Sequence, residues 1–235
     1  MTKKIPSIVL SYDRNRPLAK HMIACYESLW PDNPFLFYIP YQLAYEKNTS
    51  QCIYVKSPID IRTTVLTLLN NFADDDWIYW CIDDKYPIKL DLEITKKIVD
   101  WISTENSPDI AGLILCRTRG LLDPANLCDK KLNIGEYDFL ERKTYHQIWI
   151  HQFMRVKVLR SIFERFPSNI SKAKEMDTYK DSLIKCTDHR LFVAEKNVAV
   201  FGESTVGGKI TRNCIESIKQ KNIHDAVIIM GDENF

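Results

Sequence analysis

Apolar positions along the first half of the chain follow the periods of strands and helices in turn. Short apolar runs predict strands, and apolar residues three and four positions apart predict helices between them. The predicted strands are Ile5–Leu10, Phe35–Ile39, Cys52–Val55, Trp77–Ile82 and Ile110–Cys116; the predicted helices are Pro17–Leu29, Ile61–Phe72 and Leu92–Ile102. This alternation indicates an α/β fold with a Rossmann-like, mostly parallel sheet flanked by helices.

The pattern loosens after residue 116. Residues 117–145 are predicted to be rich in loops. Further elements are expected at Gln147–Phe153 (strand), Val156–Phe166 (helix), Met176–Lys185 (helix), Val198–Phe201 (strand) and Thr211–Lys221 (helix). No linker or repeat divides the chain, so we expect one domain over residues 1–235, with a regular half at 1–116 and an elaborated half at 117–235.

The charge and the cysteines exclude several classes of protein. The 235 residues carry 32 Lys and Arg against 31 Asp and Glu, a net charge of +1, which argues against a nucleic-acid partner. The seven cysteines are scattered without a C-x-x-C pair, which fits a reducing, cytoplasmic location. No apolar stretch reaches 18 residues, so we expect no membrane span, while a peripheral role beside a membrane stays open.

Glycine is scarce, and its scarcity excludes two families of nucleotide-binding motif. Only 7 of 235 residues are glycine, and the first of them is Gly112. A dinucleotide fingerprint or a phosphate-binding P-loop needs several glycines at fixed spacing. Any nucleotide bound near the first strand is therefore expected to be held by side chains.

Two adjacent carboxylates, Asp83 and Asp84, follow the fully apolar run Trp77–Ile82. Open α/β sheets bind ligands beyond the carboxyl ends of their strands, and paired carboxylates there can hold Mg²⁺ or Mn²⁺ together with substrate phosphates. A solvated turn is the alternative for this pair. Residues 74–76, also aspartates, precede the same strand and are expected to form a solvated turn.

The order of three segments resembles the nucleotide-sugar-binding half of GT-A-fold glycosyltransferases over residues 5–116. The segments are Ile5–Leu10 followed by Ser11-Tyr12-Asp13-Arg14, then Asp60-Ile61-Arg62, then Trp77–Ile82 followed by the DxD-like Asp83-Asp84. The resemblance implies a single GT-A-like domain whose second half binds the acceptor. The expected donor is a UDP- or GDP-sugar, the cofactor Mn²⁺ or Mg²⁺, and the acceptor a glycan or a lipid-linked molecule.

The resemblance also implies roles for single residues. Ser11, Tyr12 and Arg14 would lie near the nucleotide, and Arg62 would brace the base or the acids. Asp84 would bind the metal directly, and Asp83 would face the sugar or ribose beside it. Lys85 departs from the family pattern and would either pair with the diphosphate or weaken metal binding.

Two segments of the second half offer further chemistry. Asp177 and Glu175 open a predicted helix, where one of them could take a proton from the acceptor hydroxyl; stabilisation of the helix N-terminus is the alternative. The segment Gly202–Gly208 resembles loops that close over a diphosphate, and a plain turn between strand and helix is the alternative. If this segment closes over a diphosphate, the residues expected to contribute to binding are Gly207, Gly208, Lys209 and Arg212.

Aromatic and histidine residues of this half are less specific. Trp149 and Tyr145 could line a sugar subsite. His146 and His151 are five positions apart, which suits neither a helical nor a strand pair of metal ligands.

Two other functions remain compatible with the sequence. A sugar nucleotidyltransferase would use a similar sheet and metal, but it would normally carry a glycine-rich segment with a basic residue after the first strand. A catalytically silent nucleotide- or sugar-binding module of the same fold is the second alternative.

Overall fold

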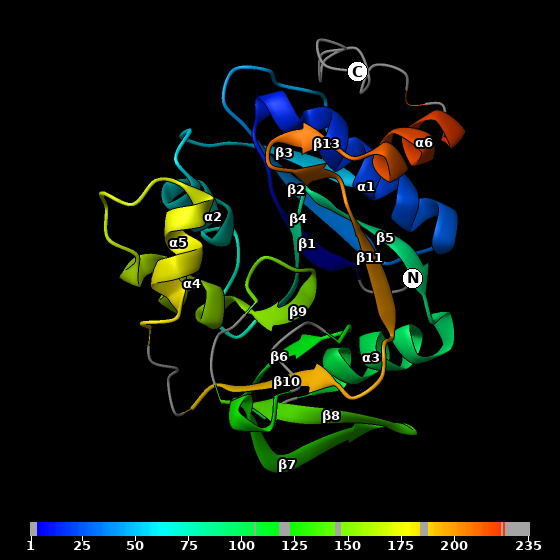
Figure 1. The fold of residues 1–235 in the computed structure, drawn as a ribbon, viewed down its shortest axis with the longest axis vertical. Coiled ribbons are helices and arrows are strands. Elements are labelled where there is room, and N and C mark those ends of the chain that lie inside the picture. The colour runs from blue at the N-terminus through cyan, green and yellow to red at the C-terminus, as the bar shows by residue number, and fades with distance from the viewer. Residues whose placement is uncertain are drawn as a thin grey trace.

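A computed structural model describes residues 4–105, 107–117, 123–143, 147–183, 188–221 and 223. Its centre is a nine-stranded sheet in the order β3-β2-β1-β4-β9-β6-β10-β8-β7 (Figure 1). The strands are β1 (Ile5–Leu10), β2 (Phe35–Tyr41), β3 (Cys52–Lys56), β4 (Trp77–Ile82), β6 (Ile110–Ile114), β7 (Leu127–Ile134), β8 (Tyr137–Arg142), β9 (Gln152–Arg155) and β10 (Arg190–Ala194). Strands from residues 1–116 and 117–235 thus share one sheet.

Most strands of the sheet run in one direction. Strands β3, β2, β1 and β4 are parallel neighbours, and β6 is parallel to β10. Strand β9 is antiparallel to β4 and to β6, between which it lies, and β8 is antiparallel to β10 and β7. The α/β class with a mostly parallel sheet is therefore confirmed.

Helices cover both faces of the sheet. Helices α1 (Arg16–Leu29), α3 (Leu92–Thr104) and α6 (Arg212–Gln220) contribute to one apolar cluster; α2 (Ile61–Leu69), α4 (Val156–Arg165) and α5 (Ala173–Lys180) contribute to the other. Strand β4 shows why its run is continuously apolar: Tyr79 and Cys81 face the first cluster, while Ile78 and Trp80 face the second. In the described part of the chain, no helix combines the length and the apolar character that crossing a bilayer requires.

Two small sheets lie beside the main one. Strand β5 (Lys85–Leu90) pairs with β11 (Ala199–Glu203), and β12 (Thr205–Val206) pairs with β13 (Lys209–Ile210). Strand β5 was not predicted, and only Asp83 and Asp84 separate it from β4. Pro87 is tolerated because β5 pairs on one side only, opposite Phe201, where the register shifts.

Several boundaries in the second half also differ from the predictions. Residues 127–142, expected as loop, form the β7–β8 hairpin, and the strand predicted at Gln147–Phe153 begins only at Gln152. The helix predicted from Met176 begins at Ala173 and ends at Lys180, and Lys185 lies outside the described residues. Strand β10 was missed.

Candidate active site

A cavity of about 470 Å³ lies where β1 and β4 end. Its size falls within the usual range for small-molecule sites. Six parts of the chain contribute to its wall: the end of β1, the start of α2, the turn after β4, the loop before β9, helix α5 and strand β12. The lining residues are Leu10, Ser11, Tyr12, Asn15, Ile59, Ile61, Thr64, Ile82, Asp83, Asp84, Trp149, Ala173, Lys174, Asp177 and Thr205.

The acid pair forms the two-residue turn between β4 and β5. Asp83 is only 7% exposed, and burial raises its pKa to about 7, although hydrogen bonds from Ser11 and Asn15 favour the charged form. Burial also raises the pKa of Asp84, with Lys85 opposing this shift. Within the described residues, Asp83 Oδ2 and Asp84 Oδ1 are buried without a hydrogen-bond partner.

Such unpaired buried oxygens cost free energy unless a ligand satisfies them. They fit one side of a Mg²⁺ or Mn²⁺ site, because these ions take oxygen ligands and often use one or two carboxylates together with substrate phosphates. Among the described residues, no three His, Cys, Asp or Glu side chains are grouped to hold a metal. The remaining ligands would therefore have to come from water and a bound diphosphate.

A buried hydrogen-bonded chain supports the acid turn from beneath. Tyr79 and Tyr26 share a hydroxyl hydrogen bond of 2.8 Å, and the Tyr26 hydroxyl lies 2.7 Å from His151 Nδ1. His151 Nε2 lies 2.9 Å from the carbonyl oxygen of Ile82, the residue that precedes the acids. Burial lowers the pKa of His151 to about 4, so the ring is neutral at pH 7 and can donate Nε2–H to Ile82.

Some residues of the segment after β1 line the cavity, and others do not. Ser11, Tyr12 and Asn15 line the cavity, whereas Arg14 is exposed and lies outside the lining. Asp13 faces the loop after β2, where its carboxylate accepts three backbone N–H groups, those of residues 42–44. Those bonds lower the pKa of Asp13 against the effect of burial, so this acid fastens a loop.

Two basic residues assigned by the resemblance are engaged elsewhere. Arg62 donates from Nε to the Phe163 carbonyl at 3.0 Å and from a terminal nitrogen to that of Glu164, so it holds the C-terminal end of α4 against α2. Lys85 forms an ion pair with Glu203, its neighbour across the β5–β11 ladder. Neither side chain lines the cavity.

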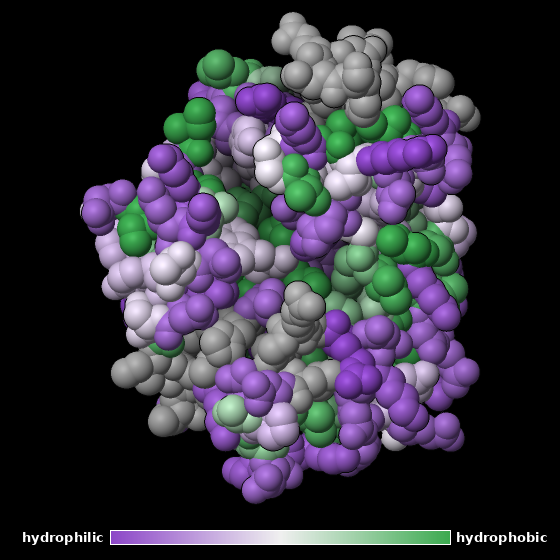
Figure 2. All heavy atoms as spheres, in the orientation of Figure 1, coloured by the Kyte–Doolittle hydropathy of each residue, from purple (hydrophilic) through white to green (hydrophobic). Residues whose placement is uncertain are grey.

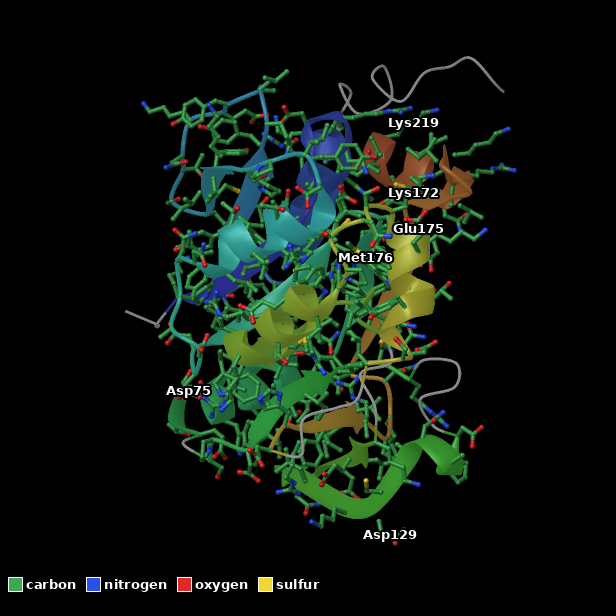
Figure 3. All side chains as sticks on the ribbon, turned by 90° about the vertical axis from the view of Figure 1, so that its left-hand side faces the viewer. Asp75, Asp129, Lys172, Glu175, Met176 and Lys219 are labelled. Atoms are coloured by element: carbon green, nitrogen blue, oxygen red, sulfur yellow. The ribbon has the colours of Figure 1, made fainter. Side chains whose placement is uncertain are left out.

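The two candidate bases, Asp177 and Glu175, both belong to α5 but have different surroundings. Asp177 lines the cavity with Lys174, and its carboxylate also pairs with Lys180 at 3.0 Å. Glu175 turns back to the start of the helix, where it accepts a long hydrogen bond from the Lys172 N–H. Figure 3 labels Lys172 and Glu175 at this end of α5. The geometry favours Asp177 over Glu175 as a group that reaches a ligand.

The glycine segment forms a tight hairpin whose first strand borders the cavity. Gly207 and Gly208 have φ angles of 61° and 80° in the turn between β12 and β13, a backbone conformation that suits glycine. Thr205 lines the cavity, while Lys209 and the largely exposed Arg212, paired with Glu216, do not. A closing role for the hairpin stays a prediction.

The aromatic candidates have different outcomes. Trp149 lines the cavity, whereas Tyr145, like His146, lies outside the described residues. Sequence reasoning missed Asn15, Thr64 and Thr205. Of these, Asn15 and Thr205 had a signal, because Asn15 belongs to the polar segment after the first strand and Thr205 belongs to the Gly202–Gly208 segment.

Comparisons with known proteins complete the description. No family model matches the chain, and no curated protein matches it. Solved structures similar to it include the 2-C-methyl-D-erythritol 4-phosphate cytidylyltransferase (IspD) of Francisella tularensis, at 11% identity and a TM-score of 0.44 over 93% of this chain and 100% of that one. Also similar is the galactosyltransferase LgtC in complex with donor and acceptor sugar analogues, at 13% identity and a TM-score of 0.41 over 78% of this chain and 68% of that one. S. aureus TarS 1–349 in complex with UDP-GlcNAc has 13% identity and a TM-score of 0.47, over 96% of this chain and 66% of that one.

Glycosyltransferases are thus among the similar structures, as the resemblance in the sequence predicts. The cytidylyltransferase stands at a comparable TM-score.

Proposed function

We propose that this chain is a glycosyltransferase that moves a sugar from a nucleoside-diphosphate sugar to an acceptor hydroxyl, with Mn²⁺ or Mg²⁺ as cofactor. The observation that carries the proposal is the pair of unpartnered oxygens, Asp83 Oδ2 and Asp84 Oδ1, in a cavity that also contains a lysine and a third carboxylate. A bound cation with a diphosphate satisfies both oxygens, and a purely structural turn leaves them unsatisfied.

The donor would occupy the part of the cavity between β1 and β4. Tyr12 offers a ring for stacking on a nucleobase, and Ser11 and Asn15 hold Asp83 in place by hydrogen bonds. Asp84, with Asp83 beside it, would hold the metal ion. Bound there, the ion would supply a positive charge that stabilises the nucleoside diphosphate as it leaves.

The acceptor would enter from the side of α5. In an inverting transfer, Asp177 would take the proton of the acceptor hydroxyl as that oxygen bonds to the sugar. Lys174 would add positive charge near the leaving diphosphate. Trp149 offers an apolar ring face for a sugar, and the acceptor would be a glycan or a lipid-linked molecule, reached in the cytoplasm.

The other residues that the resemblance implies would act from outside the cavity as it stands. Closure of the β12–β13 hairpin would bring Gly207, Gly208 and Lys209 toward the diphosphate, with Arg212 following at the start of α6. Arg14 lies close enough in sequence to Tyr12 to approach the nucleotide on closure. Arg62, Lys85 and Glu175 would contribute through the elements that they fasten.

The test measures ligand stabilisation and turnover together. A panel of nucleoside diphosphates and nucleotide sugars, with and without Mn²⁺, should raise the melting temperature of the wild type by several degrees when the ligand greatly exceeds its Kd. Asp84→Asn should lose the part that depends on Mn²⁺. The matched control is Asp76→Asn, an exposed aspartate at the other end of β4, and it should keep the full shift.

Turnover separates the three candidate functions. Release of nucleoside diphosphate from a nucleotide sugar supports a glycosyltransferase. Release of pyrophosphate from a nucleoside triphosphate and a sugar phosphate supports a nucleotidyltransferase instead, and binding without either product supports a silent module. If no nucleotide shifts the melting temperature, the proposal is wrong.

A further inference from the structure

Exposed apolar side chains gather around the mouth of the cavity. We call Tyr12, Leu43, Ile59 and Val206 the apolar rim. Leu43 is 94% exposed, Ile59 83% and Val206 65%, values that are unusual for large apolar side chains grouped together. Figure 2 shows apolar surface over the loops that follow β2 and β3 and over the β12–β13 hairpin, next to the hollowed centre of this face. Grouped exposure of this kind marks an interaction surface more often than chance.

Hydrogen bonds join the loop of Leu43 to the cavity wall. The Leu43 backbone N–H donates to Asp13 Oδ2 at 2.6 Å, and the Ala44 N–H donates to the same oxygen at 2.9 Å. Asp13 follows Tyr12, which lines the cavity. The tip that carries Leu43 is therefore fastened, and it presents the leucine outward as a fixed protrusion.

The other members of the rim are joined to the same wall. The Gln42 side-chain amide donates to the Ser57 hydroxyl at 3.1 Å and, more weakly, to the Pro58 carbonyl, which holds the segment of Ile59 against the same loop. Ile59 itself lines the cavity, and Val206 follows the lining residue Thr205. The rim thus runs around the cavity mouth from four separate parts of the chain.

Positive charge accompanies the apolar side chains. Four basic residues flank the rim, and none of them forms an ion pair with another described residue: Arg14, Lys47, Lys174 and Lys209. Two of the nearby acids have ion-pair partners, since Glu46 pairs with Lys20 and Asp177 pairs with Lys180, and Asp60, beside Ile59, accepts a hydrogen bond from the Thr63 N–H. Apolar side chains surrounded by free cations match a bilayer surface that contains anionic lipids.

We propose that the apolar rim docks on an anionic lipid surface, with Leu43, Ile59 and Val206 entering the headgroup layer and the flanking cations facing lipid phosphates. The cavity mouth would then open toward the bilayer. Docking on the lipid surface does not depend on the proposed transferase function. The further idea that a lipid-linked acceptor reaches the cavity from this surface does rest on that function.

Vesicle sedimentation tests the docking with the full chain and without nucleotide. The wild type should sediment with vesicles of phosphatidylcholine and phosphatidylglycerol, less with phosphatidylcholine alone, and less in high salt. Leu43→Asp removes an apolar contact and adds a negative charge, so partitioning into the mixed vesicles should fall roughly tenfold. The matched control is Ile88→Asp on β5, an exposed isoleucine that lines a different hollow beside α6, and it should bind as the wild type does.

Three results overturn the proposal. The wild type fails to sediment with the mixed vesicles, or Leu43→Asp and Ile88→Asp weaken binding equally, or light scattering shows a dimer that Leu43→Asp dissociates, which makes the rim an interface between copies. Nucleotide binding by Leu43→Asp is measured separately without vesicles and should match the wild type. A wild-type protein that binds nucleotide but no vesicles refutes the docking alone, and a wild-type protein that binds vesicles but no nucleotide refutes the proposed function alone.

Discussion

Replacement of Asp83 by asparagine should make the metal-free protein more stable at pH 8. The carboxyl group is 7% exposed, and burial raises its pKa from 3.8 to about 7. At ~1.36 kcal/mol for each pKa unit, this difference corresponds to about 4 kcal/mol, by which ionised Asp83 destabilises the fold. Asparagine keeps an oxygen that can accept from Ser11 and Asn15 and carries no charge, so about half of that energy, ~2 kcal/mol, should be recovered.

The direction of the Asp83 pKa shift determines the pH range over which its contribution to stability changes. The folded protein holds the Asp83 proton more tightly than the unfolded chain does, so this contribution favours folding below pH 3.8. It is lost progressively as the pH rises from 3.8 to about 7, and it is constant above that range. The stability difference between Asp83→Asn and the wild type should therefore be largest at pH 8 and small at pH 4.

Urea unfolding in EDTA at both pH values measures this difference. Asp129→Asn is the matched control, because Asp129 is exposed on β7 at the end of the molecule far from α5 (Figure 3), and its stability should follow the wild type. A variant that is no more stable than the wild type at pH 8 would refute the idea that Asp83 is held as an unsatisfied buried carboxylate. The same variant should lose stabilisation by Mn²⁺ with a nucleoside diphosphate, as expected where function opposes stability.

Three further outcomes follow from the contacts. Burial lowers the pKa of His151 from 6.5 to about 4, so the contribution of this ring to stability should fall by about 3 kcal/mol between pH 6.5 and 4, opposite in sign to that of Asp83. The free energy of unfolding of the wild type relative to His151→Gln should therefore fall by that amount over this range in urea unfolding, and a constant difference would contradict it. Gly207→Ala should lower the free energy of unfolding by about 1 kcal/mol in urea, because the φ of Gly207 is 61° and nothing crowds the added carbon. An unchanged free energy of unfolding would contradict the left-handed backbone conformation of this turn. Arg62→Ala should lower the free energy of unfolding by about 1 kcal/mol and keep nucleotide affinity in calorimetry, whereas a large loss of affinity would show that Arg62 reaches the ligand.

Most of the first half could be predicted because each of its elements except β5 has one clear period. Strand β4 is buried on both faces, so it leaves an unbroken apolar run that ends at the acid pair. Strand β5 could not be found in this way, because it lies in a two-stranded sheet with Lys89 exposed and Pro87 inside it. Strand β7 lies at the edge of the main sheet, where exposed polar side chains conceal the pattern.

The candidate site was partly predictable for a related reason. The acids after β4 and the polar segment after β1 belong to neighbouring parallel strands, so their carboxyl ends had to meet. The contact of Arg62 depends on α4, about a hundred positions further along the chain, and no local pattern reports it. Likewise, only the strand pairing of β5 with β11 places Glu203 beside Lys85.

The most direct test of the central claim is to locate Mn²⁺ and a nucleoside diphosphate in crystals of the protein. The account predicts an anomalous manganese peak against the carboxylates of Asp84 and Asp83, bridged to the diphosphate, with the base beside Tyr12. A nucleotide bound away from this cavity, or a diphosphate held there without manganese near the acids, would contradict it.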